Sequence, residues 1–234
     1  MCDSAFWLPL MQSLSASQDP LPCQVADYGD ADDLKAMAEG VLATAPAEFV
    51  LAGHSMGGRV ALEVARLAPS RIRKLVLMDT GYLPLAPGEA GDIEKAGRMA
   101  LIRVAQQDGV RAMASQWIKG MVHPARLADT ALISEILDMF ARKSAERFVR
   151  QQNALLTRPD ASAVLAGLSL PTLLLCGRQD GWASVPQHQA MQALAPHASL
   201  SVVEDAGHMV LMERPEPTIQ AIRAFIHSSL ERSC

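Results

Sequence analysis

The stretch that decides the fold is FVLAGHSMGGRVALEVA, residues 49–65, in which an apolar run meets a serine between glycines. Residues 49–52 are apolar without alternation, as in a buried parallel strand, and the apolar residues after position 56 recur at helical spacing. GHSMG matches G-x-S-x-G, a strained strand-to-helix turn that raises a serine hydroxyl above the end of a sheet. We therefore predict that Ser55 is a nucleophile; a plain glycine turn is the alternative.

Length and composition predict one substantial core, as a single large domain or a domain carrying an insertion. The chain has 234 residues, half of them apolar, which is enough to bury such a core. Its net charge of −4 comes from 21 basic and 25 acidic residues without blocks of one sign. Nucleic acid and anionic membrane surfaces are therefore not expected as partners.

The cysteines and the N-terminal segment predict a cytoplasmic protein. Cys2, Cys23, Cys176 and Cys234 are widely spaced and form no C-x-x-C pair, so we expect reduced thiols. The apolar segment AFWLPLMQSL, residues 5–14, lacks a basic region in front of it, and Pro9 interrupts it. It is expected to form a helix of the folded domain, and no apolar run is long enough to span a bilayer.

Strand-like and helix-like patterns alternate along the chain, which predicts an α/β fold with a mostly parallel sheet flanked by helices. The strongest strand candidates are residues 49–52, 74–78 and 172–176, and weaker ones are residues 23–28 and 199–204. Helical patterns cover residues 31–44, 56–68, 187–195 and about 215–230.

Between residues 83 and 167 the strand signal disappears and helical patterns follow one another. We predict a helical cap at residues 83–167, inserted into a core of residues 1–82 and 168–234. It should lie over the carboxyl ends of the strands, where open α/β sheets bind ligands. Its large apolar residues are expected to form mostly the core of the cap, with some lining a pocket: Met99, Met113, Trp117, Met121, Met139 and Phe140.

A serine nucleophile needs a base, and His208 is the best candidate among six histidines. It follows the last strand candidate in a loop where Gly207 gives the chain freedom to turn back over the sheet. His54 adjoins the serine but should point into the packing beside the strand. The others lie in insertion or helical contexts typical of surface histidines: His123, His188, His197 and His227.

The acid that orients the histidine should follow a strand, and Asp180 does so in TLLLCGRQDG. Its alternative role is that of a turn residue beside Gly181. Asp79, at the end of KLVLMD, is the competing candidate because it could also reach the imidazole. Asp205 is too close in sequence to His208. We favour Asp180 over Asp79.

The motifs LAGHSMGG, LLLCGRQD and AGHMVLMERPE, in this order, resemble the α/β-hydrolase superfamily. The resemblance extends over residues 23–230 and points to the cap-bearing branch with esterases, enol-lactonases, dehalogenases, haloperoxidases and carbon–carbon hydrolases. It implies that Ser55 is the nucleophile, Asp180 the acid and His208 the base, with the backbone N–H of Met56 as one oxyanion donor. Serine at position 55 argues against dehalogenation, because dehalogenases of this family carry aspartate there.

The chain departs from the family at its start. Members usually carry an HG or PG segment after their third strand, and the next residue supplies a second oxyanion N–H; this sequence shows no such segment. CDSAFWLPLMQSL resembles the helix after that loop, so the resemblance implies that three strands are absent. Three explanations follow: the sequence is part of a longer protein, residues 23–28 pair directly with residues 49–52, or the chain is a degenerate homologue with reduced activity.

The predicted function is hydrolysis of a small carboxylic ester, thioester or lactone through an acyl-Ser55 intermediate. The substrate is expected to be an apolar small molecule, because no charged motif for phosphate, coenzyme A or carboxylate stands out and Arg59 and Arg178 are expected at the surface. No metal or organic cofactor is expected. A serine peptidase of the same fold and a weakly active binding protein of this fold remain alternatives.

Overall fold

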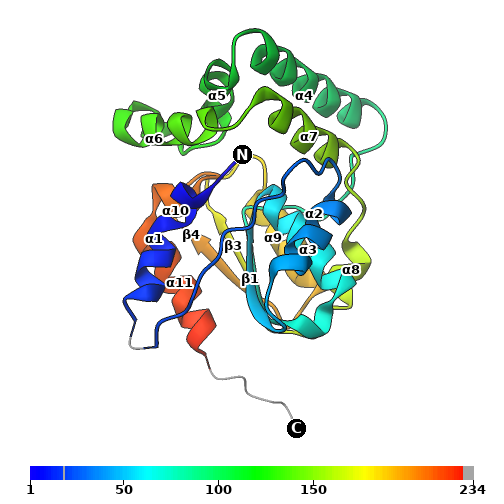
Figure 1. The fold of residues 1–234 in the computed structure, drawn as a ribbon, viewed down its shortest axis with the longest axis vertical. Helices are drawn as coiled ribbons and strands as arrows, with labels where there is room; N and C mark the ends of the chain where they lie inside the picture. Colours follow the sequence, from blue (N-terminus) through cyan, green and yellow to red (C-terminus); the bar gives the residue numbers. More distant parts are fainter. Residues whose placement is uncertain (18, 229–234) are drawn as a thin grey trace.

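The computed structural model describes residues 1–17 and 19–228. Its sheet has four parallel strands in the order β1-β2-β3-β4, with β1 at one edge (Figure 1). The strands are β1 (Phe49–His54), β2 (Ile72–Met78), β3 (Thr172–Gly177) and β4 (Ser199–Val203). Every residue of β3 is buried, as expected of a strand covered on both faces. The predicted parallel α/β architecture is therefore confirmed.

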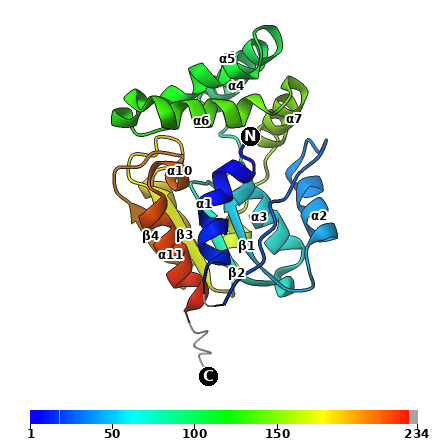
Figure 2. The ribbon, with the colours of Figure 1, turned by 60° about the vertical axis from the view of Figure 1, so that its left-hand side comes forward.

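Helices cover both faces of the sheet, and each face has its own apolar core. One face carries α1 (Ser4–Ser15), α10 (Val210–Glu213) and α11 (Pro215–His227). The other carries α2 (Leu34–Thr44), α3 (Met56–Leu67), α8 (Ser162–Ala166) and α9 (Val185–Leu194). Figure 2 shows the two layers with the strands between them. Residues 5–14 therefore lie in a helix of the folded core, as predicted.

The remaining helices form a helical insertion between β2 and β3, and Figure 1 places them beyond one end of the sheet. They are α4 (Glu89–Gln107), α5 (Val110–Trp117), α6 (Thr130–Ala141) and α7 (Ala145–Leu156). Two of these helices have side-chain N-caps, since Asp129 accepts a hydrogen bond from the N–H of Leu132 in α6, and Ser144 accepts one from that of Arg147 in α7. No helix in the described parts of the chain is both long and apolar enough to cross a bilayer.

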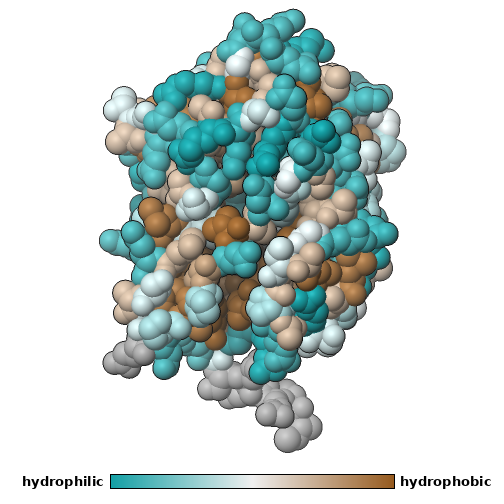
Figure 3. Space-filling view, viewed as in Figure 1, coloured by the Kyte–Doolittle hydropathy of each residue, from teal (hydrophilic) through white to brown (hydrophobic). Residues whose placement is uncertain are grey.

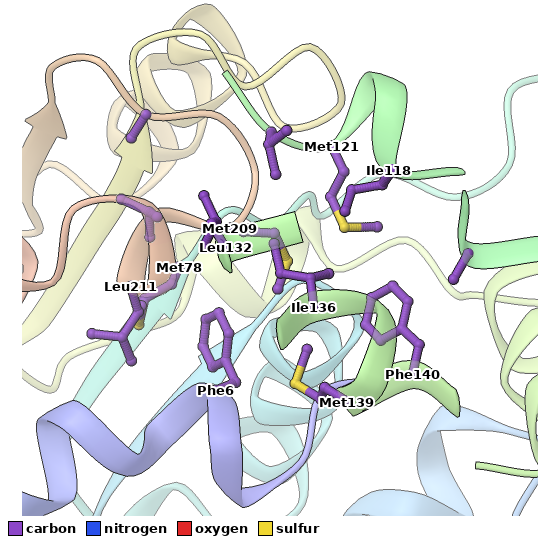
Figure 4. Close-up of a cluster of buried hydrophobic side chains, with 14 of the residues drawn as sticks. Phe6, Met78, Ile118, Met121, Leu132, Ile136, Met139, Phe140, Met209 and Leu211 are labelled. Carbon is purple, nitrogen blue, oxygen red and sulfur yellow. The ribbon is translucent and has the colours of Figure 1, made fainter. Parts of the chain in front are cut away.

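The insertion packs directly on the core through a shared apolar cluster. Figure 4 shows Leu132 and Ile136 of α6 beside Met209, which follows His208 in sequence. Met113, Met121, Met139 and Phe140 are buried, whereas Met99 is 40% exposed. Four of the six predicted side chains are therefore buried, as expected of a core, although Met121, Phe140 and Trp117 also line a cavity.

The prediction of a strand at residues 23–28 is wrong. This segment has no strand assignment, and Cys23, Gln24, Ala26 and Asp27 are exposed. The sheet order leaves β1 paired with β2 alone, so residues 23–28 do not pair directly with β1 either. An extended segment becomes a strand only when a neighbouring strand meets its N–H and C=O groups, and none lies beside this one among the described residues.

Candidate active site

Ser55 stands on a tight turn between β1 and α3. Its backbone has φ 54° and ψ −119°, a strained conformation for a residue with a side chain. The turn is held from beneath, because the N–H of Ser55 donates to the carbonyl of Met78 and its carbonyl accepts from Thr80 Oγ1 at 2.6 Å. The hydroxyl is thereby raised toward the insertion, as the G-x-S-x-G pattern predicts.

Glycine is required on both sides of this turn because the backbone approaches closely. A Cβ at position 53 would lie 2.3 Å from the carbonyl oxygen of Gly57, and one at position 58 would lie 2.6 Å from the Thr80 side chain. Such distances leave no room for a side chain. The glycines of GHSMGG therefore allow the first turn of α3 to pack against the end of β1 and the segment after β2.

The structure brings the three predicted side chains into one hydrogen-bonded chain. His208 Nε2 lies 2.8 Å from Ser55 Oγ, and His208 Nδ1 lies 2.8 Å from Asp180 Oδ2. The other Asp180 oxygen accepts the N–H groups of Trp182 and Ala183. This is the arrangement in which an imidazole accepts the hydroxyl proton while a carboxylate fixes its tautomer.

The charges around His208 favour an ionised carboxylate beside a protonatable imidazole. Burial acts to raise the pKa of Asp180, but the attraction of His208 and its hydrogen bonds outweigh burial and lower that pKa to about 2. Burial acts to lower the pKa of His208, but the Asp180 carboxylate outweighs it and raises that pKa. The pair is thus set to stabilise an imidazolium once a proton arrives.

Asp79, the competing acid, faces a different histidine. Its Oδ1 accepts the N–H of Gly177, and its Oδ2 lies 3.5 Å from Nε2 of His54. Full burial and the nearby Asp180 charge raise the pKa of Asp79 well above its ordinary value, which favours the neutral acid. A neutral carboxyl group is poorly suited to stabilise an imidazolium, so the geometry and the charge both favour Asp180.

The positions of the five other histidines agree only in part with the sequence-based predictions. His54 is buried and its Nε2 lies 2.7 Å from the carbonyl oxygen of His208, which agrees with packing beside the strand. His197 and His227 are exposed, and His123 is half-buried. The surface expectation for His188 is wrong, because α9 turns this side chain completely inward, and burial lowers its pKa.

The loop that carries His208 is fixed by two contacts that the motifs did not single out. Glu213 is buried and accepts the backbone N–H groups of Gly207, Met209 and His123. The N–H of His208 itself donates to the carbonyl of Met121 in the insertion, at 2.6 Å. The role of Glu213 could have been predicted from the sequence, since this glutamate follows the histidine closely in the mostly apolar segment AGHMVLME. Nothing in the sequence around Met121 indicates its contact with His208.

Aromatic side chains cover the histidine from the insertion side. The Trp182 ring lies 4.9 Å from that of His208, and Trp117 stacks on Trp182 with centroids 5.4 Å apart. Trp182 follows Asp180 by two residues, so its nearness to the site could have been inferred from the sequence. The pair forms an apolar wall above the imidazole.

A cavity of about 1020 Å³ opens at Ser55 and His208. Its walls include Trp117, Met121 and Phe140, so some apolar residues of the insertion do line the pocket, as predicted. Arg59 also lines the cavity, which corrects its expected place at the surface, because α3 carries it one turn beyond Ser55. Arg178 instead pairs with Glu204 at the surface, as predicted.

Arginines outnumber carboxylates in the part of the cavity beside Arg59. Arg98 and Arg158 share the carboxylate of Glu94, whereas Arg59 Nη1 donates to the carbonyl of Leu83. Burial, followed by the repulsion of Arg158, lowers the pKa of Arg59 to about 9, so its guanidinium still carries its charge at neutral pH. This end of the cavity is therefore electropositive.

One free thiol lies in the cavity, because Cys2 lines it and its Sγ is 3.7 Å from Nδ1 of His54. Cys2, Cys23 and Cys176 are free thiols, and Cys234 lies outside the described residues. No cluster of three or more side chains suited to hold a metal ion occurs within residues 1–17 and 19–228.

Comparison with known proteins places the chain in a family. Residues 13–221 match the alpha/beta hydrolase family, and the chain belongs to that family. It is 25% identical over 182 residues to an sn-1-specific diacylglycerol lipase from Mus musculus, a match over 76% of this chain. The chain spans 58% of the length of that lipase.

Solved structures show the same fold. A thermophilic esterase from Thermogutta terrifontis superposes with a TM-score of 0.80 at 26% identity, covering 96% of this chain and 85% of the esterase. An enol-lactonase from Burkholderia xenovorans LB400 superposes with a TM-score of 0.79 at 18% identity, covering 97% of this chain and 88% of the lactonase. The predicted resemblance to this superfamily is thereby confirmed.

Proposed function

We propose that this protein is a serine hydrolase that cleaves a small carboxylic ester, thioester or lactone through an acyl-Ser55 intermediate. The observation that carries the proposal is the hydrogen-bonded chain from Ser55 Oγ through the His208 imidazole to Asp180 Oδ2, with both links at 2.8 Å. In that geometry the hydroxyl can attack a carbonyl carbon as its proton passes to His208.

Each group has a defined part in the two halves of the reaction. His208 Nε2 takes the proton of Ser55 and then gives it to the leaving alcohol or thiol, while Asp180 keeps Nδ1 protonated. Water then attacks the acyl carbon with His208 again as base, the bond to Ser55 Oγ breaks, and His208 returns the proton to Ser55 as the carboxylic acid leaves. The backbone N–H of Met56, at the start of α3, would donate to the oxyanion, because the first N–H groups of a helix have no partner within it.

We propose a division into two domains to go with this function. Residues 1–82 and 168–234 would form the core that holds Ser55, Asp180 and His208, and residues 83–167 would form a cap over the substrate. Helix α8 lies within this second range, although it packs against α3 and α9 of the core. The cap proper would therefore consist of α4 to α7.

The cavity suggests which esters fit. Its apolar wall near Ser55, with Trp117 and Phe140, suits an apolar acyl or alcohol group, as the sequence suggested. Its electropositive end at Arg59 adds a preference for substrates that carry an anionic group away from the scissile bond. A small apolar ester with a distant carboxylate would use both features.

A covalent probe tests the proposal directly. A fluorophosphonate should label the wild-type protein at Ser55, and Ser55→Ala should abolish labelling without changing the thermal unfolding midpoint. Thr80→Ser, which keeps the hydroxyl beneath the turn, is a control that should still be labelled. A folded wild-type protein that resists labelling would contradict the proposal. Turnover of a peptide anilide but of no p-nitrophenyl ester would favour a peptidase instead.

A further inference from the structure

Cys2 and His54 bring a second possible nucleophile and a second possible base into the cavity, apart from Ser55 and His208. The Sγ atom of Cys2 lies 3.7 Å from Nδ1 of His54, within the range of a hydrogen bond to sulfur. Both residues line the cavity, and Cys2 is only half-buried, so a molecule in the cavity can reach its thiol. The thiol therefore lies beside an imidazole in the same space as Ser55.

The hydrogen bonds of the His54 ring leave its Nδ1 free to act as a base. Its Nε2 lies 2.7 Å from the carbonyl oxygen of His208, and because a carbonyl only accepts, Nε2 carries the hydrogen. In the neutral ring Nδ1 then has the lone pair, which faces the Cys2 thiol. Phe6 packs on the ring with centroids 4.2 Å apart, which helps to hold this orientation.

A buried carboxyl group is directed at the same ring and has an unpaired oxygen. Asp79 is fully buried, its Oδ2 has no hydrogen-bond partner among the described residues, and this atom lies 3.5 Å from Nε2 of His54. When Nδ1 takes a proton from Cys2, the ring becomes positive and attracts this oxygen. A buried polar atom without a partner is unfavourable, so proton transfer from Cys2 to His54 is favoured.

The environment of Cys2 increases its share of thiolate. Burial acts to raise the pKa of this thiol, but the hydrogen bond and the charge of His54 outweigh burial and lower that pKa. Burial instead raises the pKa of Cys23, and it raises that of Cys176 to about 12. Because the thiolate is the nucleophilic form, Cys2 should be the most reactive of these three cysteines.

We infer that Cys2 is a second nucleophile of the cavity and adds to an apolar α,β-unsaturated carbonyl compound, with His54 as its base. In this step Sγ forms a bond to the β-carbon, the C=C π bond breaks, and the α-carbon takes the proton that the thiol gave to His54. All atoms of both reactants stay in the adduct, so the step needs neither an oxidant nor a leaving group.

The walls of the cavity favour a neutral, apolar compound of this class. They include Trp7, Leu101 and Phe140, and Figure 3 shows hydrophobic residues gathered in a hollow on one face of the molecule. Sulfur is soft and polarisable, which suits attack on the β-carbon of an activated double bond. Under the proposed function Ser55 attacks a carbonyl carbon instead, so the two nucleophiles would select different atoms.

Peptide mass spectrometry of the wild-type protein treated with 2-cyclohexen-1-one tests the inference. At neutral pH the adduct should form at Cys2 about tenfold faster than at Cys23, an exposed thiol that donates to the carbonyl of Leu21. No lysine or arginine separates the two cysteines, so fragment ions of their shared tryptic peptide locate the adduct. Equal rates at the two positions, or slower reaction at Cys2, would overturn the inference.

A substitution at His54 tests its part as the base. His54→Gln keeps an N–H group that can donate to the carbonyl of His208 but lacks the basic Nδ1. It should slow adduct formation at Cys2 about tenfold without changing the rate at Cys23. His197→Gln, at an exposed histidine, is the matched control and should change neither rate. A folded His54→Gln protein that reacts at Cys2 as fast as the wild type would contradict the inference.

Two further variants assign the adduct and separate the inference from the proposed hydrolysis. Cys2→Ser should lose the adduct at position 2 while Cys23 reacts as before, and Ser55→Ala should form the Cys2 adduct as fast as the wild type. A protein that resists the fluorophosphonate but adds the enone at Cys2 would contradict the hydrolase proposal and support this one. Thermal unfolding checks each variant, and the comparison of Cys2 with Cys23 decides the inference even if His54→Gln fails to fold.

Discussion

On the side of Ser55 that faces β3 and β4, the side chains of His208 and Asp180 are paired with each other and with Ser55, whereas along the outer edge of β1 the backbone has no strand partner among the described residues. His208 and Asp180 are buried and bonded to each other, and Glu213 accepts three N–H groups beneath them. Beyond β1 the N–H and C=O groups of Val50 and Ala52 meet no strand of the described chain. His208 and Asp180 are thus fixed in place, while no strand of the described chain pairs with the outer edge of β1.

The largest effect on activity is expected from substitution of Asp180. Asp180→Asn should lower kcat/KM for a p-nitrophenyl ester by about 10³- to 10⁴-fold, because the amide no longer stabilises the imidazolium or its tautomer. The matched control is Asp79→Asn, which replaces a buried carboxyl group that contacts His54 rather than His208. Asp79→Asn should lower kcat/KM for the same ester by less than about tenfold. If the two variants lose activity equally, Asp180 does not have the distinct role that we propose.

A smaller effect should follow from loosening the support under His208. Glu213→Gln places an NH₂ group opposite one of the three N–H donors and should lower the free energy of unfolding by about 1–3 kcal/mol. Chemical denaturation measures this change. Glu216→Gln, an exposed glutamate three residues along the chain, should change the free energy of unfolding by less than about 0.5 kcal/mol. A stable Glu213→Gln protein would show that the loop has other sufficient supports.

The smallest effect is expected at the electropositive end of the cavity. Arg59→Ala should lower kcat/KM about tenfold for an ester carrying a distant carboxylate and leave a neutral ester of the same size nearly unchanged. Arg178→Ala, at the surface with Glu204, is the control and should affect neither substrate. Equal losses on both esters would mean that Arg59 shapes the cavity without selecting anionic substrates.

The sequence predicted the parts of the fold that depend on local patterns. The runs at residues 49–52, 74–78 and 172–176 all lie in strands. Residues 74–78 and 172–176 are buried, whereas residues 49–52 lie in an edge strand in which Val50 is 40% exposed. Residues 23–28 carry a similar but weaker pattern and are not a strand, since strand formation there requires a neighbour that the local sequence does not encode. Local pattern therefore marks apolar runs but determines neither strand pairing nor burial at an edge such as that of Val50.

The candidate site also contains some features that the sequence predicted and others that it did not. Ser55, His208 and Asp180 were identified from motifs because each follows a strand end in a recognisable setting, and the structure brings their side chains together. The contact of Met121 with His208 joins residues far apart in sequence through a backbone carbonyl, which no side-chain pattern can reveal. The inward turn of His188 likewise depends on how α9 packs.

The hydrogen bond from the N–H of His208 to the carbonyl of Met121 limits how freely the helical insertion can be exchanged. The insertion does not simply cover a finished site, since its backbone helps to position the segment that carries the imidazole. A chimaera that receives its insertion from a relative must therefore present a carbonyl at the same point, whatever its side chains are. Substitutions on the inner wall of the insertion should therefore keep the backbone path around residues 118–123.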